Sequence, residues 1–74
     1  SDASMSDIEL IQNLSTRELY ILQQLARGLS NKKIAEDMIL SSKTISTYKA
    51  RLIEKLNIKS VVYLADFAKR NDLI

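Results

Sequence analysis

Apolar residues recur along this chain every three or four positions, which is the spacing of one face of an α-helix. No segment shows the strict alternation of a half-buried strand. The first long helix is predicted over residues 16–27. Ser15 and Glu18 form a capping box at its start, and Gly28 supplies a left-handed residue at its end. The pattern therefore predicts an all-α fold.

Three further helices follow at the same apolar spacing. Residues 31–38 are predicted as a short helix capped by Ser30, and residues 42–56 as a longer helix capped by Ser41. Ser60 is expected to cap a last helix of about ten residues. The inward positions of this last helix are predicted to be Val61, Leu64, Ala65 and Ala68.

The two middle helices are joined by a tight turn over residues 39–41. A turn of this length forces a steep crossing, which is typical of a helix-turn-helix. The predicted architecture is an all-α, four-helix bundle-like domain that contains a helix-turn-helix and spans residues 14–74. The small and polar residues at the start of 1–13 indicate a linker or an expression remnant, with a short leading turn at 8–13.

The composition excludes several classes of function. A chain of 74 residues suffices for one small domain. It contains no Cys and no His, which removes disulfides, thiolate metal sites and the commonest general base. Its single Gly leaves no glycine-rich phosphate loop, so no enzyme activity, metal or cofactor is expected. No apolar run approaches the ~20 residues of a membrane span, so a cytoplasmic protein without membrane contact is predicted.

The net charge of +2 is unevenly distributed along the chain. Residues 1–29 carry two cationic and four acidic side chains, which gives −2. Residues 30–60 carry seven cationic and three acidic side chains, which gives +4, and residues 61–74 are neutral. Such a concentration is expected of an electrostatic footprint for nucleic acid. On charge alone, an ordinary solvated helical surface explains it better.

The helix predicted over residues 42–56 has an unusual polar face. On a helical wheel of ~100° per residue, Ile45, Leu52 and Leu56 form its apolar stripe. The opposite side carries short or cationic side chains, which fit the major groove and can address base edges. These base-contact candidates are Lys43, Ser46, Thr47 and Ala50. Glu54 follows one turn later and would be repelled by phosphates, so it marks the end of the groove-inserted part.

Phosphate contacts are expected from flanking cations and from the N-termini of two helices, where free N–H groups favour anions. The candidates are Ser30, Asn31, Lys32, Ser42, Thr44, Tyr48, Lys49 and Arg51. Plain capping is at least as good an explanation for Ser30 and Thr44. Tyr48 is better explained as a half-buried core residue with its hydroxyl toward the phosphates than as a base-stacking residue.

The last predicted helix has more apolar side chains than one buried face needs. Val62, Tyr63 and Phe67 cannot all point inward together with Leu64 and Ala68. These three residues are therefore candidates for a dimer interface. An equally good explanation for Tyr63 and Phe67 is that they cover the edge of a small core.

Three motifs recur in a recognisable order along residues 14–56. They are Leu14-Ser15-x-Arg17-Glu18, Ala26-x-Gly28-Leu29-Ser30-Asn31-Lys32-x-Ile34-Ala35 and Leu40-Ser41-x-x-Thr44-Ile45. This order resembles the LuxR/FixJ/NarL-type output domains of bacterial response regulators. The runs 43–49 and 68–71 look most like the branch that includes BvgA and EvgA. Many relatives carry His and Lys where this chain has Tyr48 and Ala50.

The resemblance implies a sequence-specific DNA-binding output domain of a two-component transcriptional regulator, with residues 42–56 in the major groove. It also implies a homodimer on double-stranded DNA, with half-sites about 10 bp apart, and a receiver domain N-terminal to this segment. The alternative is a protein-interaction module that docks RNA polymerase or its own receiver domain. A DNA affinity that falls steeply with salt favours the first hypothesis, and a weak dependence favours the second.

Overall fold

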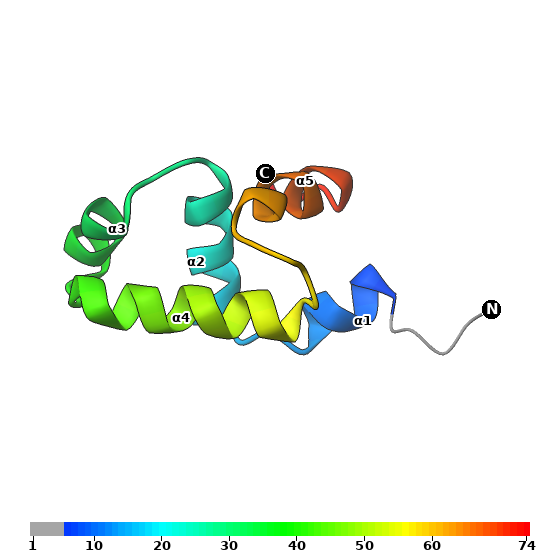
Figure 1. Ribbon diagram of the computed structural model, residues 1–74, viewed down its shortest axis with the longest axis horizontal. Coiled ribbons are helices and arrows are strands. Elements are labelled where there is room, and N and C mark those ends of the chain that lie inside the picture. The colour runs from blue at the N-terminus through cyan, green and yellow to red at the C-terminus, as the bar shows by residue number, and fades with distance from the viewer. Residues whose placement is uncertain (1–5) are drawn as a thin grey trace.

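A computed structural model describes residues 6–74, and residues 1–5 of the predicted linker lie outside this range. The described part folds into five α-helices without a strand (Figure 1). They are α1 (Asp7–Gln12), α2 (Thr16–Ala26), α3 (Asn31–Met38), α4 (Ser42–Lys55) and α5 (Val62–Arg70). The all-α class is confirmed, and α2, α3 and α4 begin where the sequence predicts. The leading turn is longer than expected and forms the complete helix α1.

Serine caps begin four of the five helices, because its hydroxyl accepts a hydrogen bond from a free N–H of the first turn. The caps of α1 to α4 are Ser6, Ser15, Ser30 and Ser41. The prediction that Ser60 caps α5 is wrong. The cap position of α5 is Val61, which has helical dihedral angles and makes no side-chain cap. The Ser60 carbonyl instead accepts a hydrogen bond from the Tyr63 N–H at 3.1 Å, so the helix starts one residue later.

The helices α2 to α5 all end in the same way. One residue adopts a positive φ, and the N–H of the next residue bonds back to a carbonyl five positions earlier, as in the Schellman motif. The positive-φ residues are Gly28, Ile39, Asn57 and Asp72. The residues that follow them are Leu29, Leu40, Ile58 and Leu73, and all four pack against the core. The motif therefore stops each helix and folds an apolar side chain under its end.

A single core lies between α2, α3, α4 and α5. It is made of Ile21, Leu22, Ile34, Ala35, Ile45, Leu52, Leu56, Leu64, Phe67 and Ala68. The last helix turns a different face inward than the sequence analysis expects. Phe67 is 1% exposed and belongs to this core, so its assignment to a dimer interface is wrong. Val61, expected inward, is 39% exposed because it precedes the first turn of α5.

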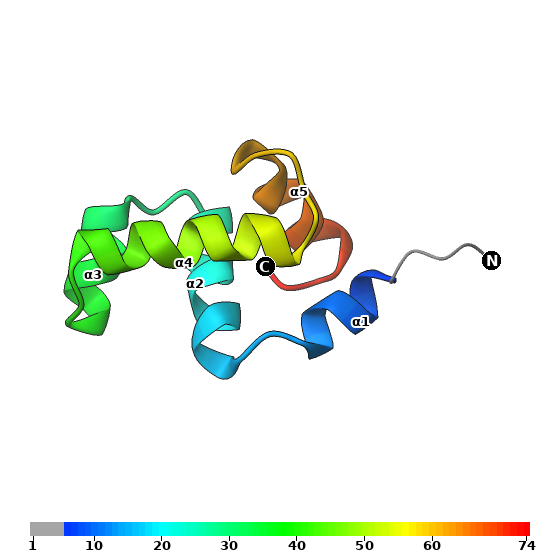
Figure 2. The same cartoon turned by 60° about the horizontal axis from the view of Figure 1, so that its bottom comes forward.

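Helix α4 is the longest element and organises the others along its length. In Figures 1 and 2, α3 lies beside the N-terminal end of α4, whereas α5 and α1 lie toward its C-terminal end. Helices α3 and α4 with the turn between them form the predicted helix-turn-helix. The exposed side of α4 in its first turns is thereby separated from α1 and α5.

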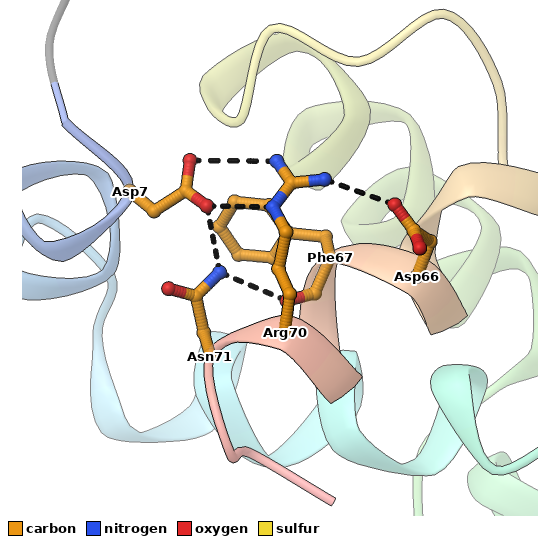
Figure 3. A network of polar contacts seen from close by, with 5 residues as sticks. All are labelled: Asp7, Asp66, Phe67, Arg70 and Asn71. Atoms are coloured by element: carbon orange, nitrogen blue, oxygen red, sulfur yellow. Dashed lines mark hydrogen bonds and ion pairs between the residues drawn. The ribbon is translucent and has the colours of Figure 1, made fainter.

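Polar contacts tie α1 to the end of α5 (Figure 3). The Arg70 Nε donates to Asp7 Oδ2 at 2.8 Å, and the Asn71 amide donates to the same oxygen at 2.8 Å. Asn71 also donates to the Phe67 carbonyl at 2.9 Å, and Arg70 Nη1 donates to Asp66 at 3.0 Å. The pKa of Asp7 is lowered by these bonds, first by that from Arg70 and then by that from Asn71. We refer to Asp7, Arg70 and Asn71 as the α1 clasp.

Candidate nucleic-acid interface

The outer side of α4 carries the predicted base-contact candidates together. Lys43, Ser46, Thr47 and Ala50 are all exposed. The opposite side of the helix is anchored by Ile45 and Leu52, which are both 0% exposed. The helical wheel therefore divides α4 correctly into a core side and a free side. Whether the free side contacts DNA is a separate question, which the functional proposal below addresses.

Two predicted phosphate-contact residues are engaged in capping. The Ser30 hydroxyl accepts a hydrogen bond from the Lys33 N–H at 3.1 Å. The Thr44 N–H donates to the Ser41 hydroxyl at 3.1 Å, and the two hydroxyls lie 2.9 Å apart. Capping satisfies one free N–H in each helix and leaves the other N–H groups of the first turn without a helical partner. Both N-termini therefore keep donors for an anion.

The other phosphate-contact candidates surround the free side of α4. Lys32, Ser42 and Arg51 are exposed, while Asn31, Tyr48 and Lys49 are half-buried. The guanidinium carbon of Arg51 lies 5.5 Å from the centre of the Tyr48 ring. This distance is within the range of a cation–π contact, which holds the arginine beside the helix. Tyr48 thus takes the half-buried position that the sequence analysis expects.

Two hydrogen bonds on this surface escaped the sequence analysis. The Asn31 amide nitrogen donates to the Ser46 hydroxyl oxygen at 2.9 Å and joins α3 to α4. The Thr47 hydroxyl donates to the Lys43 carbonyl at 3.1 Å, one turn back along α4. The second bond has a sequence signal, because Thr in a helix commonly bonds to the carbonyl four residues earlier. The first depends on how α3 crosses α4, which residue spacing does not specify.

The cations of this surface are not neutralised from within the protein. Within residues 6–74, the ion pairs are Lys33–Asp37, Lys55–Glu18, Arg70–Asp7 and Arg70–Asp66, at 2.8 to 3.1 Å. The pKa of Lys33 is raised by its bond to Asp37. Four cationic side chains take part in none of these pairs. They are Lys32, Lys43, Lys49 and Arg51, all of them phosphate- or base-contact candidates.

A buried carboxylate anchors the far end of α4. Glu18 is 4% exposed and accepts hydrogen bonds from the Ser15 N–H at 2.9 Å and from the Lys55 ammonium at 2.9 Å to each oxygen. Its pKa is lowered, chiefly by the Ser15 backbone bond and next by Lys55. The capping box is visible in the sequence, but the pairing across α2 and α4 is not. It fixes the axis of α4 relative to α2.

The fold and the surface together define a helix-turn-helix domain whose second helix presents unpaired cations and short polar side chains. No helix in residues 6–74 has the length and apolar composition that crossing a membrane requires. The family model of bacterial regulatory proteins of the luxR family matches residues 12–68. The chain belongs to this family.

Individual relatives agree with this assignment. The chain is similar to BvgA of Bordetella pertussis, described as a positive transcription regulator of virulence factors, with 60% identity over 72 residues, 97% of this chain and 34% of BvgA. It is 51% identical to the Fimbriae Z protein of Salmonella typhimurium over 61 residues, 82% of this chain and 29% of that protein. It is 44% identical to the DNA-binding transcriptional activator EvgA of Escherichia coli K12 over 68 residues, 92% of this chain and 33% of EvgA. The chain thus spans about a third of the length of these relatives, and the resemblance to BvgA and EvgA is confirmed.

Proposed function

We propose that this chain is the sequence-specific DNA-binding output domain of a two-component transcriptional regulator, with α4 in the major groove. The observation that carries the proposal is the set of cations without intramolecular ion pairs around the free side of α4. Phosphates would neutralise them and release counterions, which supplies most of the affinity of such proteins for DNA. The short side chains Ser46, Thr47 and Ala50 let the helix approach base edges closely.

The helix N-termini support the same placement. Ser30 begins α3 and Ser41 begins α4, and each helix offers free backbone N–H groups beside a cation. In a helix-turn-helix the second helix enters the major groove while the first crosses the backbone. Asn31 and Lys32 would then face phosphates from α3, and Ser42 and Thr44 from α4. The proposed function involves no catalytic step and no cofactor.

Salt dependence of binding tests the proposal. The affinity of the 74-residue chain for a promoter duplex is measured by fluorescence anisotropy from 50 to 300 mM salt, a range of about sixfold. Log affinity should fall linearly with log salt, and Lys43→Ala should reduce the slope by about 0.9, the value for one phosphate contact. Lys69→Ala, which removes an exposed cation from α5, should leave the slope unchanged. An affinity insensitive to salt, or unaffected by replacing Lys43, Lys49 and Arg51, would refute DNA binding and favour a protein-docking domain.

We further propose that α5 joins two copies of the domain on DNA. Val62 and Tyr63 are 73% and 51% exposed on this helix. Tyr63 also lines an open pocket of about 270 Å³ together with Asn57, Ile58, Lys59, Asp66 and Arg70. An aromatic side chain beside an apolar neighbour is a typical centre for an interface between proteins. A homodimer would place its two α4 helices on half-sites about one helical turn apart.

The remaining partners are proposals from the family resemblance. A receiver domain N-terminal to the segment would control whether two domains meet on DNA. RNA polymerase would be the partner through which the bound regulator affects transcription, and this activity places the protein in the cytoplasm.

A further inference from the structure

Two hydroxyl groups on the free side of α4 are already committed to hydrogen bonds without DNA. The Thr47 hydroxyl donates its proton to the Lys43 carbonyl at 3.1 Å. The Ser46 hydroxyl uses an oxygen lone pair instead, because it accepts from the Asn31 amide at 2.9 Å. Both residues are exposed and adjacent in sequence, so both commitments concern the same small area of surface.

These commitments give the two hydroxyls opposite polarity toward a ligand. A hydroxyl has one O–H donor and two acceptor lone pairs. Thr47 has used its proton and presents only lone pairs outward. Ser46 has used a lone pair and keeps its proton, which takes part in no hydrogen bond given by the described residues. Reversing either hydroxyl would break the bond that it now makes.

We propose that Thr47 and Ser46 read neighbouring base pairs with opposite polarity, and that Asn31 is the positioning residue that sets the polarity of Ser46. This inference rests on the proposed function and specifies the bases that α4 selects. Thr47 accepts from the exocyclic amine of adenine or cytosine. Ser46 donates to a keto oxygen, O6 of guanine or O4 of thymine. Consecutive Cα atoms lie about 3.8 Å apart, close to the ~3.4 Å spacing of bases along a strand, so the two positions are adjacent.

The rest of this surface cannot replace Thr47. Lys43 has three donors and no side-chain acceptor, and Ala50 has no polar side-chain atom. Among the four base-contact candidates, selection for an amino base therefore depends on Thr47 alone. Selection for a keto base is shared between Ser46 and Lys43, because both donate.

Selection from a random duplex library tests the proposal, with sequencing of the bound fraction for each variant of the 74-residue chain. Thr47→Val keeps the shape and the methyl group but removes the lone pairs. It should abolish the preference for A or C at one position, a loss of roughly three- to tenfold for one hydrogen bond. Ser46→Ala should relax the preference for G or T at the neighbouring position. Thr16→Val is the matched control, since Thr16 is an exposed residue of α2.

Asn31 provides the sharper experiment, because one variant inverts the expected preference. The carboxylate of Asn31→Asp can only accept, so it would take the Ser46 proton and leave the Ser46 lone pairs facing outward. The preference at the Ser46 position should change from G or T to A or C. Asn31→Ala should only relax it. The added negative charge lowers affinity for all sequences alike, whereas the ratio between bases reports the polarity.

The outcomes separate this inference from the proposed function. If the unmodified chain selects no sequence above random DNA, the proposed function fails and the inference falls with it. If the chain selects a motif and Thr47→Val, Ser46→Ala and Asn31→Asp select the same motif, the inference alone is wrong. A recovered motif with the opposite polarity at these two positions would also overturn it. A position-specific loss in Thr47→Val and an inversion in Asn31→Asp would establish it.

Discussion

Ile39 occupies a backbone conformation that its side chain opposes. Its φ is 58°, in the left-handed region, and its side chain is 92% exposed. The same position at the ends of the other helices is held by Gly28, Asn57 and Asp72, which tolerate this conformation better. A β-branched residue there carries steric strain, and its exposure means that little packing offsets the strain.

Replacing this isoleucine should therefore stabilise the domain. Ile39→Asn should raise the free energy of unfolding by about 1 kcal/mol, the scale of a left-handed residue's strain. The reciprocal change Asn57→Ile, at the equivalent end of α4, should lower it by a similar amount. Urea unfolding of the three proteins checks both values. A loss of stability in Ile39→Asn would mean that the exposed side chain contributes packing that outweighs the strain.

Glu18 is the residue on which acid stability should depend most. Its carboxylate is almost fully buried and has hydrogen bonds from both α2 and α4. Its pKa is lowered from the ordinary value of 4.5. A carboxylate with a depressed folded-state pKa adds stability above its unfolded pKa. That stability is lost as pH falls through the folded-state pKa.

Glu18→Gln should lower the free energy of unfolding at pH 7 by about 1–3 kcal/mol, because Lys55 loses its charged partner. The difference from the unmodified chain should shrink as pH falls below 4.5. Glu9→Gln is the matched control, since Glu9 holds the same capping-box position in α1 and is exposed. Urea unfolding between pH 7 and pH 2.5, about 2 units below the ordinary pKa of a carboxyl, measures both. A constant difference across this range would show that packing, not charge, explains the loss.

At the scale of elements, local sequence signals predicted most of the fold. The boundaries of α2, α3 and α4 follow from serine caps and helical spacing, which act within a few residues. The start of α5 was predicted wrongly, because the serine before it was taken as a cap although its carbonyl serves the turn. The burial of Phe67 depends on the rotation of α5 against α2 and α4, which follows from packing. The same reason hides the contact between Asn31 and Ser46.

The predicted linker segment is a helix that is attached by the α1 clasp. Asp7→Asn should weaken the bonds to Arg70 and Asn71 and let α1 open more often. Hydrogen exchange at the Leu10 N–H, which bonds to the Ser6 carbonyl, should become roughly two- to fivefold faster. In the unmodified chain the same loss should appear as pH falls below 3.8, the ordinary pKa of the carboxyl, since the pKa of Asp7 is lowered.

Asp66→Asn is a matched control for the α1 clasp. Asp66 bonds the same guanidinium of Arg70, but from within α5, so its loss should leave exchange in α1 unchanged. Faster exchange at Leu10 in both variants would contradict a specific attachment. It would indicate that any loss of charge around Arg70 releases the helix.

At the scale of the whole molecule, the two proposed contact surfaces lie at different places along α4. The DNA-facing residues lie in its first turns beside α3, whereas α5 and α1 lie toward its other end (Figure 2). This separation lets two copies meet through α5 without covering the surface that faces DNA. The sequence alone gave both residue sets but not their separation, which depends on the packing of four helices around α4.

Pairing through α5 predicts a specific defect in cooperative binding. Tyr63→Glu should reduce affinity for a duplex with two half-sites about 10 bp apart and leave affinity for one half-site unchanged. Folding stability should change by less than about 0.5 kcal/mol, because Tyr63 is 51% exposed. Tyr20→Glu makes the same change on α2, where the side chain is 42% exposed, and should bind both duplexes normally. Equal losses on the one-site and two-site duplexes would place Tyr63 at the DNA and remove α5 as the interface between copies.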